Sequence, residues 1–350
     1  MVKERFYKTE VVPRCLTFKR PAGTSRGVYT TRKLWEVRIR KEDEPSVIGI
    51  GECAPLPDLS CDYGVDYEIT LSKACLDLEQ KGYVDTESLR HYPSILFGLE
   101  IAMRHYEQGG WRHYDTPFSR GQAGIPINGL IWMGDYKYML EQVEEKMKEG
   151  FRCVKLKIGA IDFDRELSLL KHIRTHFSAK EIELRVDANG AFTPPEAMDK
   201  LKRLAEMDLH SIEQPIRAGQ LEEMAHLAAE SPLPIDEELI GCNAPDEKRR
   251  LLETIHPQYI ILKPSLHGGI SGCTEWIHLA EAILGSTPEQ PKWWVTSALE
   301  SQIGLNAIAQ WCATLGNPLP QGLGTGEIFK DDKHRLIQRK GDTIWFTNDL

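Results

Sequence analysis

The spacing of apolar and polar positions changes at about residue 125 of this 350-residue chain. Beyond that point, short β-branched runs alternate with longer segments whose apolar residues recur at helical spacing. The strand-like runs are, in order, IPINGL, CVKLKIG, IELRVD, LHSIEQPI, LPIDEEL, YIILKPS, KWWVTSALES and LPQGLGTG. Eight strand-then-helix units in about 200 residues predict an α/β fold, a modified (β/α)8 barrel of the TIM type.

The first 60 residues follow a different pattern. Short β-branched and aromatic runs are separated by turn clusters such as PAGTSRG and KEDEP, which predicts antiparallel strands. Residues 65–108 have helical spacing, 109–124 read as a polar linker, and the tail is strand-like again. We therefore predict an α+β domain over residues 1–120, completed by 325–350, and a barrel over 121–324.

Composition and charge narrow the function classes. A net charge of −9 argues against a general nucleic-acid binder, which needs a basic surface. No run of eighteen apolar residues predicts a membrane span, and the first residues, MVKERFYKTE, lack the apolar core of a signal peptide. Eight scattered cysteines without a CxxC pair indicate reduced thiols rather than a disulfide framework or zinc site. We expect a cytoplasmic protein with no membrane or nucleic-acid partner.

Charged residues recur at the ends of five successive predicted barrel strands. They are Lys155 with Lys157, then Asp187, Glu213, Asp236 with Glu237 and Glu238, and Lys263. A single carboxylate after a strand is commonly a helix N-cap, and a single lysine there is commonly solvated. For all of these residues to be caps or solvated lysines, five consecutive strands would each have to end in a charged residue by chance. We therefore expect the charges to meet at the carboxyl-terminal mouth of the barrel, where active sites of this fold lie.

Three carboxylates in one partly enclosed mouth require a counter-charge. A divalent cation with oxygen ligands, Mg²⁺ in particular, is the simplest compensation. A lysine beside such a cation has a lowered pKa and can serve as a base near neutral pH. The combination suits proton abstraction next to a substrate carboxylate, whose negative charge the metal stabilises.

With these residues identified, the sequence resembles the enolase superfamily, and within it the muconate-lactonizing-enzyme subgroup. The resemblance covers nearly the whole chain and rests on five motifs in order: VKLKIG, RVDANGAF, SIEQPI, PIDEEL and ILKPS. It implies that the amino-terminal domain caps the barrel with two loops, corresponding to residues 21–29 and 49–60. It also implies a small-molecule carboxylate substrate and a bound Mg²⁺.

The resemblance implies a role for each residue of the mouth. Asp187, Glu213 and Asp236 would bind Mg²⁺, while Lys157 would act as base on one side of the substrate and Lys263 would face the other. Lys155 would keep positive charge beside Lys157, Glu237 would contact Lys263, and Asn189 would support the metal ligands. Hydroxyl and backbone N–H groups for the substrate carboxylates, with a nearby amide, would come from Thr296, Ser297, Gly322, Gly324 and Asn128.

Arg185 separates the reactions of the subgroup. It is similar to an arginine typical of the dedicated dehydrating synthases, whereas racemase-like relatives usually carry another residue there. It shares a strand face with Asp187, so we expect it to reach the two lysines and bias their protonation. The implied reaction is a syn elimination of water from a cyclohexadiene carboxylate. The alternatives are an N-acylamino acid racemase or dipeptide epimerase, and a non-catalytic barrel kept as a binding module.

Overall fold

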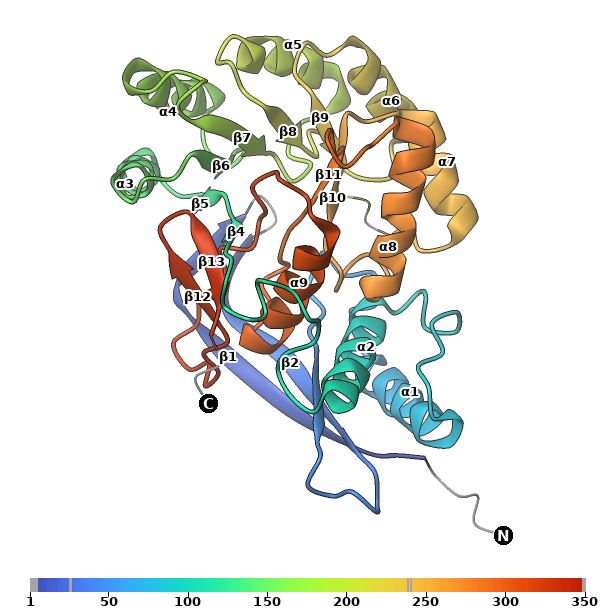
Figure 1. Cartoon of the computed structure of the whole chain (residues 1–350). Helices are drawn as coiled ribbons and strands as arrows, with labels where there is room; N and C mark the ends of the chain where they lie inside the picture. Colours follow the sequence, from blue (N-terminus) through green and yellow to red (C-terminus); the bar gives the residue numbers. More distant parts are fainter. Residues whose placement is uncertain (1–5, 25–26, 238, 240, 348–350) are drawn as a thin grey trace.

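The computed structural model describes residues 6–24, 27–237, 239 and 241–347 (Figure 1). A parallel sheet curls through the centre with helices outside it, and a separate antiparallel sheet with two helices lies at one end. The α/β fold class, a modified barrel with an α+β domain beside it, is therefore confirmed. The boundaries proposed for the two domains stay a prediction.

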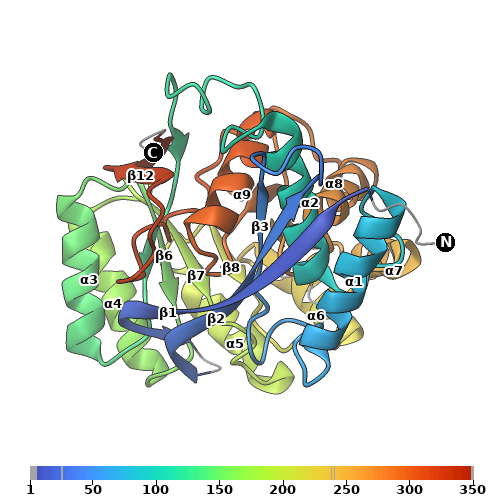
Figure 2. The same ribbon diagram turned by 90° about the horizontal axis from the view of Figure 1, so that it is seen from below.

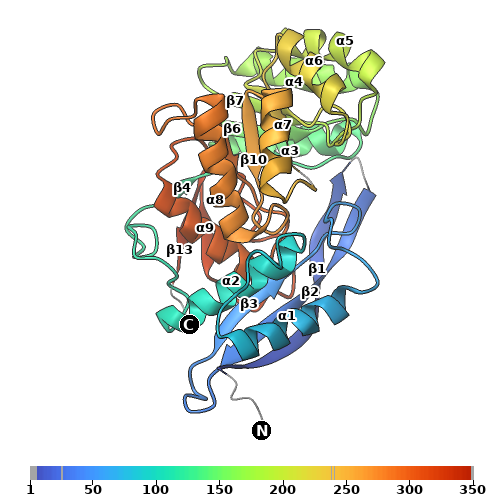
Figure 3. The same cartoon turned by 90° about the vertical axis from the view of Figure 1, so that its right-hand side faces the viewer.

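The amino-terminal domain is an antiparallel sheet in the order β1-β2-β3. Its strands are β1 (Lys8–Thr24), β2 (Gly27–Arg40) and β3 (Gly49–Cys53). Figure 3 shows α1 (Tyr67–Lys81) and α2 (Pro93–Gln108) against this sheet. The contact with α2 is close, since a Cβ at Gly51 would lie 1.9 Å from the Gly98 carbonyl oxygen. Glycine is therefore required there, and it lets α2 pack directly on β3.

The barrel sheet contains seven parallel strands in the order β11-β10-β9-β8-β7-β6-β5. These strands are β5 (Gly129–Ile131), β6 (Cys153–Lys157), β7 (Glu183–Asp187), β8 (Ser211–Glu213), β9 (Ile235–Glu237), β10 (Tyr259–Leu262) and β11 (Trp293–Val295). The crossover helices are α3 (Tyr136–Lys148), α4 (Phe163–His176), α5 (Pro194–Ala205), α6 (Leu221–Glu230), α7 (Pro245–Ile255), α8 (Gly269–Leu279) extended by η1 (Ala280–Leu284), and α9 (Gln302–Leu315). The predicted alternation of strand and helix is confirmed for these seven units.

The eighth predicted unit is shorter than expected. Residues 321–322 form only isolated bridges, Ile127↔Gln321 on one side and Thr296↔Gly322 on the other. Their hydrogen bonds nevertheless join both edges of the sheet, because Asn128 N–H donates to Gln321 O and Gly322 N–H donates to Val295 O. Between residues 323 and 347 the described chain forms no helix. The barrel is thus closed by a two-residue strand instead of a full strand-then-helix unit.

The carboxyl-terminal tail forms a small sheet in the order β12-β13-β4. It consists of β12 (Ile337–Lys340), β13 (Thr343–Phe346) and β4 (Ile125–Pro126), which leads into the first barrel strand. The segment before β12 contacts β1 instead, through the Phe18↔Phe329 bridge and the bond from Thr17 N–H to Asp331 Oδ1 (2.8 Å). The tail therefore touches both the barrel and the amino-terminal sheet.

The two domains meet along an apolar cluster and a charged network. The cluster joins Leu16, Phe18 and Leu56 of the amino-terminal domain to Leu266 and Leu299 of the barrel loops. Figure 2 shows β1 and β2 extending across the barrel, which brings the strands to these loops.

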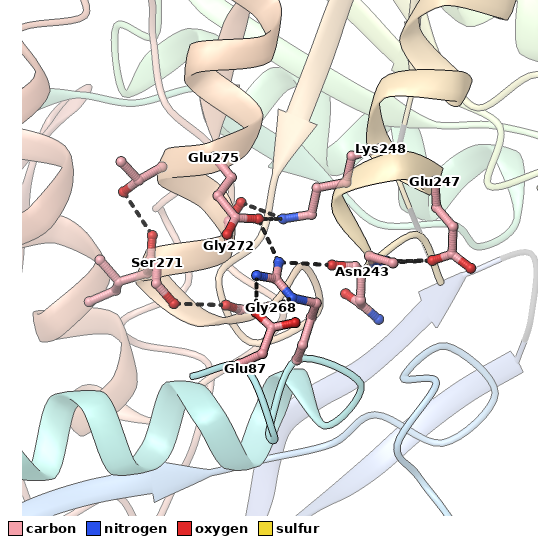
Figure 4. A network of polar contacts seen from close by, with 12 residues as sticks. Glu87, Asn243, Glu247, Lys248, Gly268, Ser271, Gly272 and Glu275 are labelled. Atoms are coloured by element: carbon pink, nitrogen blue, oxygen red, sulfur yellow. Dashed lines mark hydrogen bonds and ion pairs between the residues drawn. The ribbon is translucent and has the colours of Figure 1, made fainter. Parts of the chain in front are cut away.

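The charged network lies at the α7–α8 side (Figure 4). Buried Lys248 donates to Gly272 O (2.9 Å) and to Glu275 Oε2 (2.7 Å). Arg90, between α1 and α2, donates to the same Glu275 oxygen (2.7 Å) and to Asn243 O (3.2 Å). The Glu275 carboxylate thus accepts hydrogen bonds from two cationic side chains, one from each domain.

The described part of the chain contains neither a membrane-spanning helix nor a disulfide bond. Among the described residues, no helix has the length and apolar character needed to cross a bilayer. All eight cysteines carry free thiols. Packing and hydrogen bonds, without covalent cross-links, therefore hold the fold.

Two buried histidines make the stability of the fold sensitive to acid. His105 stacks on Trp111 with ring centroids 4.2 Å apart, and its Nδ1 accepts the Ile50 N–H (2.9 Å). His113 is 1% exposed, and its ring nitrogens have no hydrogen-bond partner among the described residues. Burial lowers the pKa of His105 to about 4 and that of His113 to about 3. Both rings are therefore neutral in the fold at neutral pH.

We expect His113→Phe to protect the fold against acid. Between the ordinary pKa of 6.5 and about 3, the unfolded chain binds a proton at His113 that the folded chain does not. Stability is thus lost as the pH falls, by about 1.4 kcal/mol per pH unit. The variant should gain about 2 kcal/mol over the parent when urea unfolding is measured at pH 5 instead of pH 7. His226→Gln, at an exposed histidine, is the control, and an equal pH response of all three proteins would contradict the prediction.

Candidate active site

The strand register brings the predicted metal ligands together. Lys157 is the Cα partner of Asp187, Asp187 that of Glu213, and Glu213 that of Asp236, along β6 to β9. Neighbouring strands lie about 4.8 Å apart, so these residues form one continuous row at the carboxyl ends of the strands. Lys263 follows directly after β10, the next strand. The expected convergence of charges at the barrel mouth is observed.

Three ammonium groups contact two of the carboxylates. Lys155 Nζ lies 2.5 Å from Glu213 Oε2 and 3.4 Å from Asp187 Oδ2. Lys157 Nζ lies 2.9 Å from the same Asp187 oxygen. Lys263 Nζ lies 2.8 Å from Glu213 Oε1. Each carboxylate is therefore shared between two lysines.

These contacts set the protonation of the group. Burial tends to raise the pKa of Asp187, but the surrounding lysines, Lys157 first, hold it well below its usual range. The pKa of Glu213 is lowered in the same way, against burial and the Asp187 charge. Burial tends to lower the pKa of Lys155, but Glu213 and Asp187 outweigh it and raise the pKa. The two carboxylates therefore keep Lys155 in its charged form.

Asp236 stands apart from the lysine contacts. Its Oδ2 accepts the Ser211 hydroxyl (2.8 Å), whereas its buried Oδ1 has no hydrogen-bond partner among the described residues. Burial raises the pKa of Asp236 well above its usual range, and the neighbouring Glu213 charge adds to this. An unpartnered buried carboxylate oxygen is costly unless something compensates it.

A divalent cation fits this donor set. Asp187, Glu213 and Asp236 offer oxygen ligands in adjacent register on three neighbouring strands, and the free Asp236 oxygen belongs to one of them. With the side chains turned as described, no group of three His, Cys, Asp or Glu residues among the described residues is arranged around a metal position. Glu213 and Asp187 face lysines instead, so metal binding requires these side chains to reorient.

Asn189 links the predicted base to a predicted ligand. Its Oδ1 accepts a hydrogen bond from Lys157 Nζ (2.8 Å), and its backbone N–H donates to Asp187 Oδ1 (2.9 Å). The left-handed backbone of Asn189 (φ 46°) allows both contacts from one turn. Glu237 is buried on the same row, but its expected contact with Lys263 stays a prediction. Glu238 lies outside the described residues.

Arg185 is the Cα partner of Lys155 across β6 and β7, and its expected effect on the protonation of the two lysines stays a prediction. Its guanidinium donates to Glu183 Oε1 (2.7 Å) and to Pro320 O (3.0 Å). It also stacks over the Trp294 ring, 4.0 Å from the centroid. Arg185 shares a strand face with Asp187, but it is two residues nearer the start of the strand. The side chain is fully buried and packs on Trp294, and it is not part of the cavity wall described below.

A cavity that is partly open to solvent lies over the barrel mouth. Its wall includes Lys155, Lys157, Asp187, Asn189 and Lys263. The predicted substrate-binding residues also line it: Asn128, Thr296, Ser297, Gly322 and Gly324. The structure therefore brings the predicted lysines and the predicted substrate contacts to one space.

The polar atoms available in this cavity differ from the expectation. The buried Thr296 Oγ1 and Asn128 Oδ1 have no hydrogen-bond partner among the described residues, so the Thr296 hydroxyl can donate to or accept from a ligand and the Asn128 oxygen can accept. The backbone N–H of Gly322 is not available, since it donates to Val295 O (2.8 Å) in the barrel closure. Gly322 instead provides space, because a Cβ there would lie 2.4 Å from Thr296 Oγ1. Its role as an N–H donor to substrate is corrected accordingly.

The apolar wall of the cavity was not identified from the sequence. Tyr29, Leu56 and Leu59 come from the two predicted capping loops, of which residues 25–26 are not described. Trp132 follows the first barrel strand and lines the same space. Tyr29 and Trp132 lie within or beside segments that the motifs had singled out, but an aromatic residue near a motif is as consistent with core packing.

Comparison with known proteins agrees with this geometry. The family model described as "Enolase C-terminal domain-like" matches residues 138–338. The chain is 44% identical to the o-succinylbenzoate synthase of Desulfotalea psychrophila, over 91% of this chain and 93% of that protein. The crystal structure of MenC from the same organism superposes with a TM-score of 0.79 and 36% identity, covering 97% and 99% of the chains.

A more distant structure shares the fold. The dipeptide epimerase from Enterococcus faecalis, solved with Mg and the dipeptide L-Leu-L-Tyr, superposes with a TM-score of 0.81. The match covers 97% of this chain and 96% of that one at 17% identity. At this level of identity the likeness concerns the fold alone.

Proposed function

The chain belongs to the enolase superfamily, and from that premise we propose that it catalyses the reaction of an o-succinylbenzoate synthase. In this reaction 2-succinyl-6-hydroxy-2,4-cyclohexadiene-1-carboxylate loses water and becomes 2-succinylbenzoate, a step of menaquinone biosynthesis. The observation that carries the proposal is that Lys157 and Lys263 line one cavity together with Asp187. The 44% identity to a synthase over most of both chains favours dehydration among the reactions this arrangement can perform.

Lys157 is the proton carrier in this proposal. Its ammonium contacts Asn189 and Asp187 at the cavity wall, so the neutral amine is held at a defined place once its proton has left. It removes the proton α to the ring carboxylate and then returns that proton to the departing hydroxyl on the same face. Water leaves, two electrons complete the aromatic ring, and Lys157 ends the cycle as it began.

The other residues bind and orient the substrate. Asp187, Glu213 and Asp236 would hold Mg²⁺, which would supply positive charge to stabilise the negative charge that forms on the substrate carboxylate as the proton leaves. Lys263, fixed by Glu213, places a cation against the opposite face of the ring. Thr296 and Asn128 offer their unpartnered oxygens to the polar groups of the substrate, and the apolar wall excludes water.

The direct test is an assay of the cyclohexadiene dehydration with and without Mg²⁺, beside a panel of N-succinyl amino acids and dipeptides. The proposal expects dehydration to require Mg²⁺ and to exceed turnover of every amino-acid substrate. It is contradicted if the protein exchanges an amino-acid α-proton with solvent deuterium faster than it dehydrates the cyclohexadiene. That result would favour the second candidate, a racemase or epimerase, for which two lysines lining one cavity are suited. Absence of any Mg²⁺ effect on activity or stability would favour a non-catalytic barrel.

Replacing Lys263 with alanine should cost less activity than replacing the proton carrier. In dehydration Lys263 contributes only a cation beside the ring, worth about 1–2 kcal/mol, so kcat should fall about tenfold. A racemase needs both lysines to exchange protons, and its activity would be abolished by either change. The measurement compares kcat of Lys263→Ala and Lys157→Ala in the same assay. Equal losses in the two variants would contradict the one-base mechanism.

A further inference from the structure

Arg32 is a buried charge at the contact between the domains that the mechanism above does not use. It lies on β2, and 2% of its surface is exposed. Its guanidinium donates to Pro55 O (2.7 Å) and Ala54 O, which belong to the second capping loop. It also donates to Leu299 O (3.1 Å) and Ala298 O (3.3 Å), which follow β11. One side chain therefore joins two separate walls of the cavity.

Glu52 on β3 holds the same region from the amino-terminal domain. Its carboxylate accepts the backbone N–H of Ser301 (2.9 Å) and of Gly304 (3.0 Å), together with the Ser301 hydroxyl. These groups form the first turn of α9, whose N-cap is Ser301. A carboxylate at this place satisfies N–H groups that have no partner within the helix.

Glu300 extends the network to a third wall. It accepts the Ala298 N–H (2.7 Å) and the Ser265 hydroxyl (2.5 Å). Ser265 is two residues beyond Lys263, in the loop that follows β10. Glu300 and Glu52 also act electrostatically on Arg32: burial lowers the pKa of Arg32, and the two carboxylates oppose this lowering.

The segment held in this way has an unusual backbone. Leu299 has a positive φ of 64°, a conformation that a branched side chain adopts only when its surroundings enforce it. Arg32 binds the Leu299 carbonyl, and Ser297 Oγ accepts the Leu299 N–H (3.0 Å). Thr296, Ser297, Ala298 and Leu299 all line the cavity. The direction of the Thr296 and Ser297 hydroxyls therefore depends on how this turn is fixed.

We propose that Arg32 is a positioning residue that locks the turn at residues 296–299 to the second capping loop and so aims Thr296 and Ser297 at the substrate. Only a planar guanidinium with several N–H groups can bind four carbonyls on two segments, and a lysine ammonium cannot reproduce that fork. The inference rests on the proposed function only for the identity of the substrate. The contacts that fix the turn exist without any ligand.

Arg32→Lys tests the inference against Arg90→Met as matched control. Arg90 also joins the two domains, through Glu275 and the Asn243 carbonyl, but none of these residues lines the cavity. We expect Arg32→Lys to raise KM for the cyclohexadiene and Kd for 2-succinylbenzoate about tenfold, the effect of about 1.4 kcal/mol. kcat should change less than KM, since Lys157 and its partners are untouched. Arg90→Met should alter neither constant.

A second measurement does not depend on activity. Hydrogen exchange of the amides at residues 297–301 should become about tenfold faster in Arg32→Lys than in Arg90→Met, equivalent to about 1.4 kcal/mol. If the Arg32 variant does not fold, Glu52→Gln replaces it. The Ser301 and Gly304 N–H groups bind different oxygens of the Glu52 carboxylate, and glutamine keeps only one acceptor oxygen.

Unchanged KM, Kd and exchange at 297–301, with thermal stability lowered as in Arg90→Met, would overturn the inference and leave Arg32 a purely structural contact. If the parent protein shows no dehydration at all, the proposed function fails. The exchange measurement then still decides the role of Arg32.

Discussion

Replacing Lys157 with methionine lowers kcat for the dehydration by about 10³-fold, if Lys157 carries the proton as proposed. Methionine keeps a flexible apolar stem of similar length but can neither accept nor return a proton. Lys157 Nζ contacts Asp187 and Asn189, and its side chain is only 12% exposed. A lysine on the protein surface therefore cannot take its place as the proton carrier. The measurement is a steady-state assay at saturating Mg²⁺, accompanied by thermal unfolding.

Lys200→Met serves as the control for this prediction. Lys200 lies on α5, where it pairs with Glu196 (3.1 Å) and stays outside the cavity. It should keep the parent kcat, and Lys157→Met should still bind 2-succinylbenzoate. Retention of more than a tenth of the parent kcat in Lys157→Met would show that another group removes the proton.

Removing the metal has the second large effect. We expect a chelator to abolish dehydration and added Mg²⁺ to restore it, since the negative charge formed on the substrate would otherwise face Asp187, Glu213 and Asp236. In Asp236→Asn, the Mg²⁺ concentration for half-maximal activity should rise about 100-fold. Mg²⁺ at 100 times its Kd should stabilise the parent by about 2.7 kcal/mol, and the same concentration should stabilise the variant by less than about 1 kcal/mol.

Asp236 is the informative ligand to change because it has no lysine contact. Replacing Asp187 or Glu213 would also leave Lys157, Lys155 or Lys263 without an ion-pair partner. In Asp236→Asn the Ser211 hydroxyl keeps an acceptor, and a buried carboxyl group that is costly to ionise becomes a neutral amide. The metal-free variant should therefore unfold at or above the temperature of the metal-free parent. Mg²⁺ stabilisation equal in parent and variant would contradict Asp236 as a ligand.

Much of the site could be read from the chain because barrel topology converts sequence order into proximity. Lys157, Asp187, Glu213 and Asp236 each end an apolar run, and parallel strands place such ends side by side. The seven strand-helix units followed from the change of apolar spacing. The helix starts could be read locally as well, as at α5, which begins at Pro194 and where Glu196 accepts the Thr193 N–H (2.9 Å).

The sequence did not predict how deep a side chain lies within the barrel, or which residues far apart in the chain contact each other. Arg185 and Asp187 share a face, but which layer a long side chain enters depends on partners more than 100 residues away, Trp294 and Pro320. Gly322 shows the same limit, because its N–H is used by Val295 in a closure only two residues long. No local pattern distinguishes an N–H that closes the barrel from one that faces a ligand.

The sequence alone thus determined the order of strands and helices and the row of charges at the barrel mouth. The apolar periodicity and the positions of the strand ends are local properties of the sequence. Parallel pairing of neighbouring strands then places the strand ends side by side. Only the tertiary structure decided which carboxylate each lysine contacts, which oxygens stay free, and how Arg32 joins the capping loop to the turn at Leu299. Those features depend on side-chain reach, burial and the meeting of segments far apart in the chain, where close packing selects one arrangement among many.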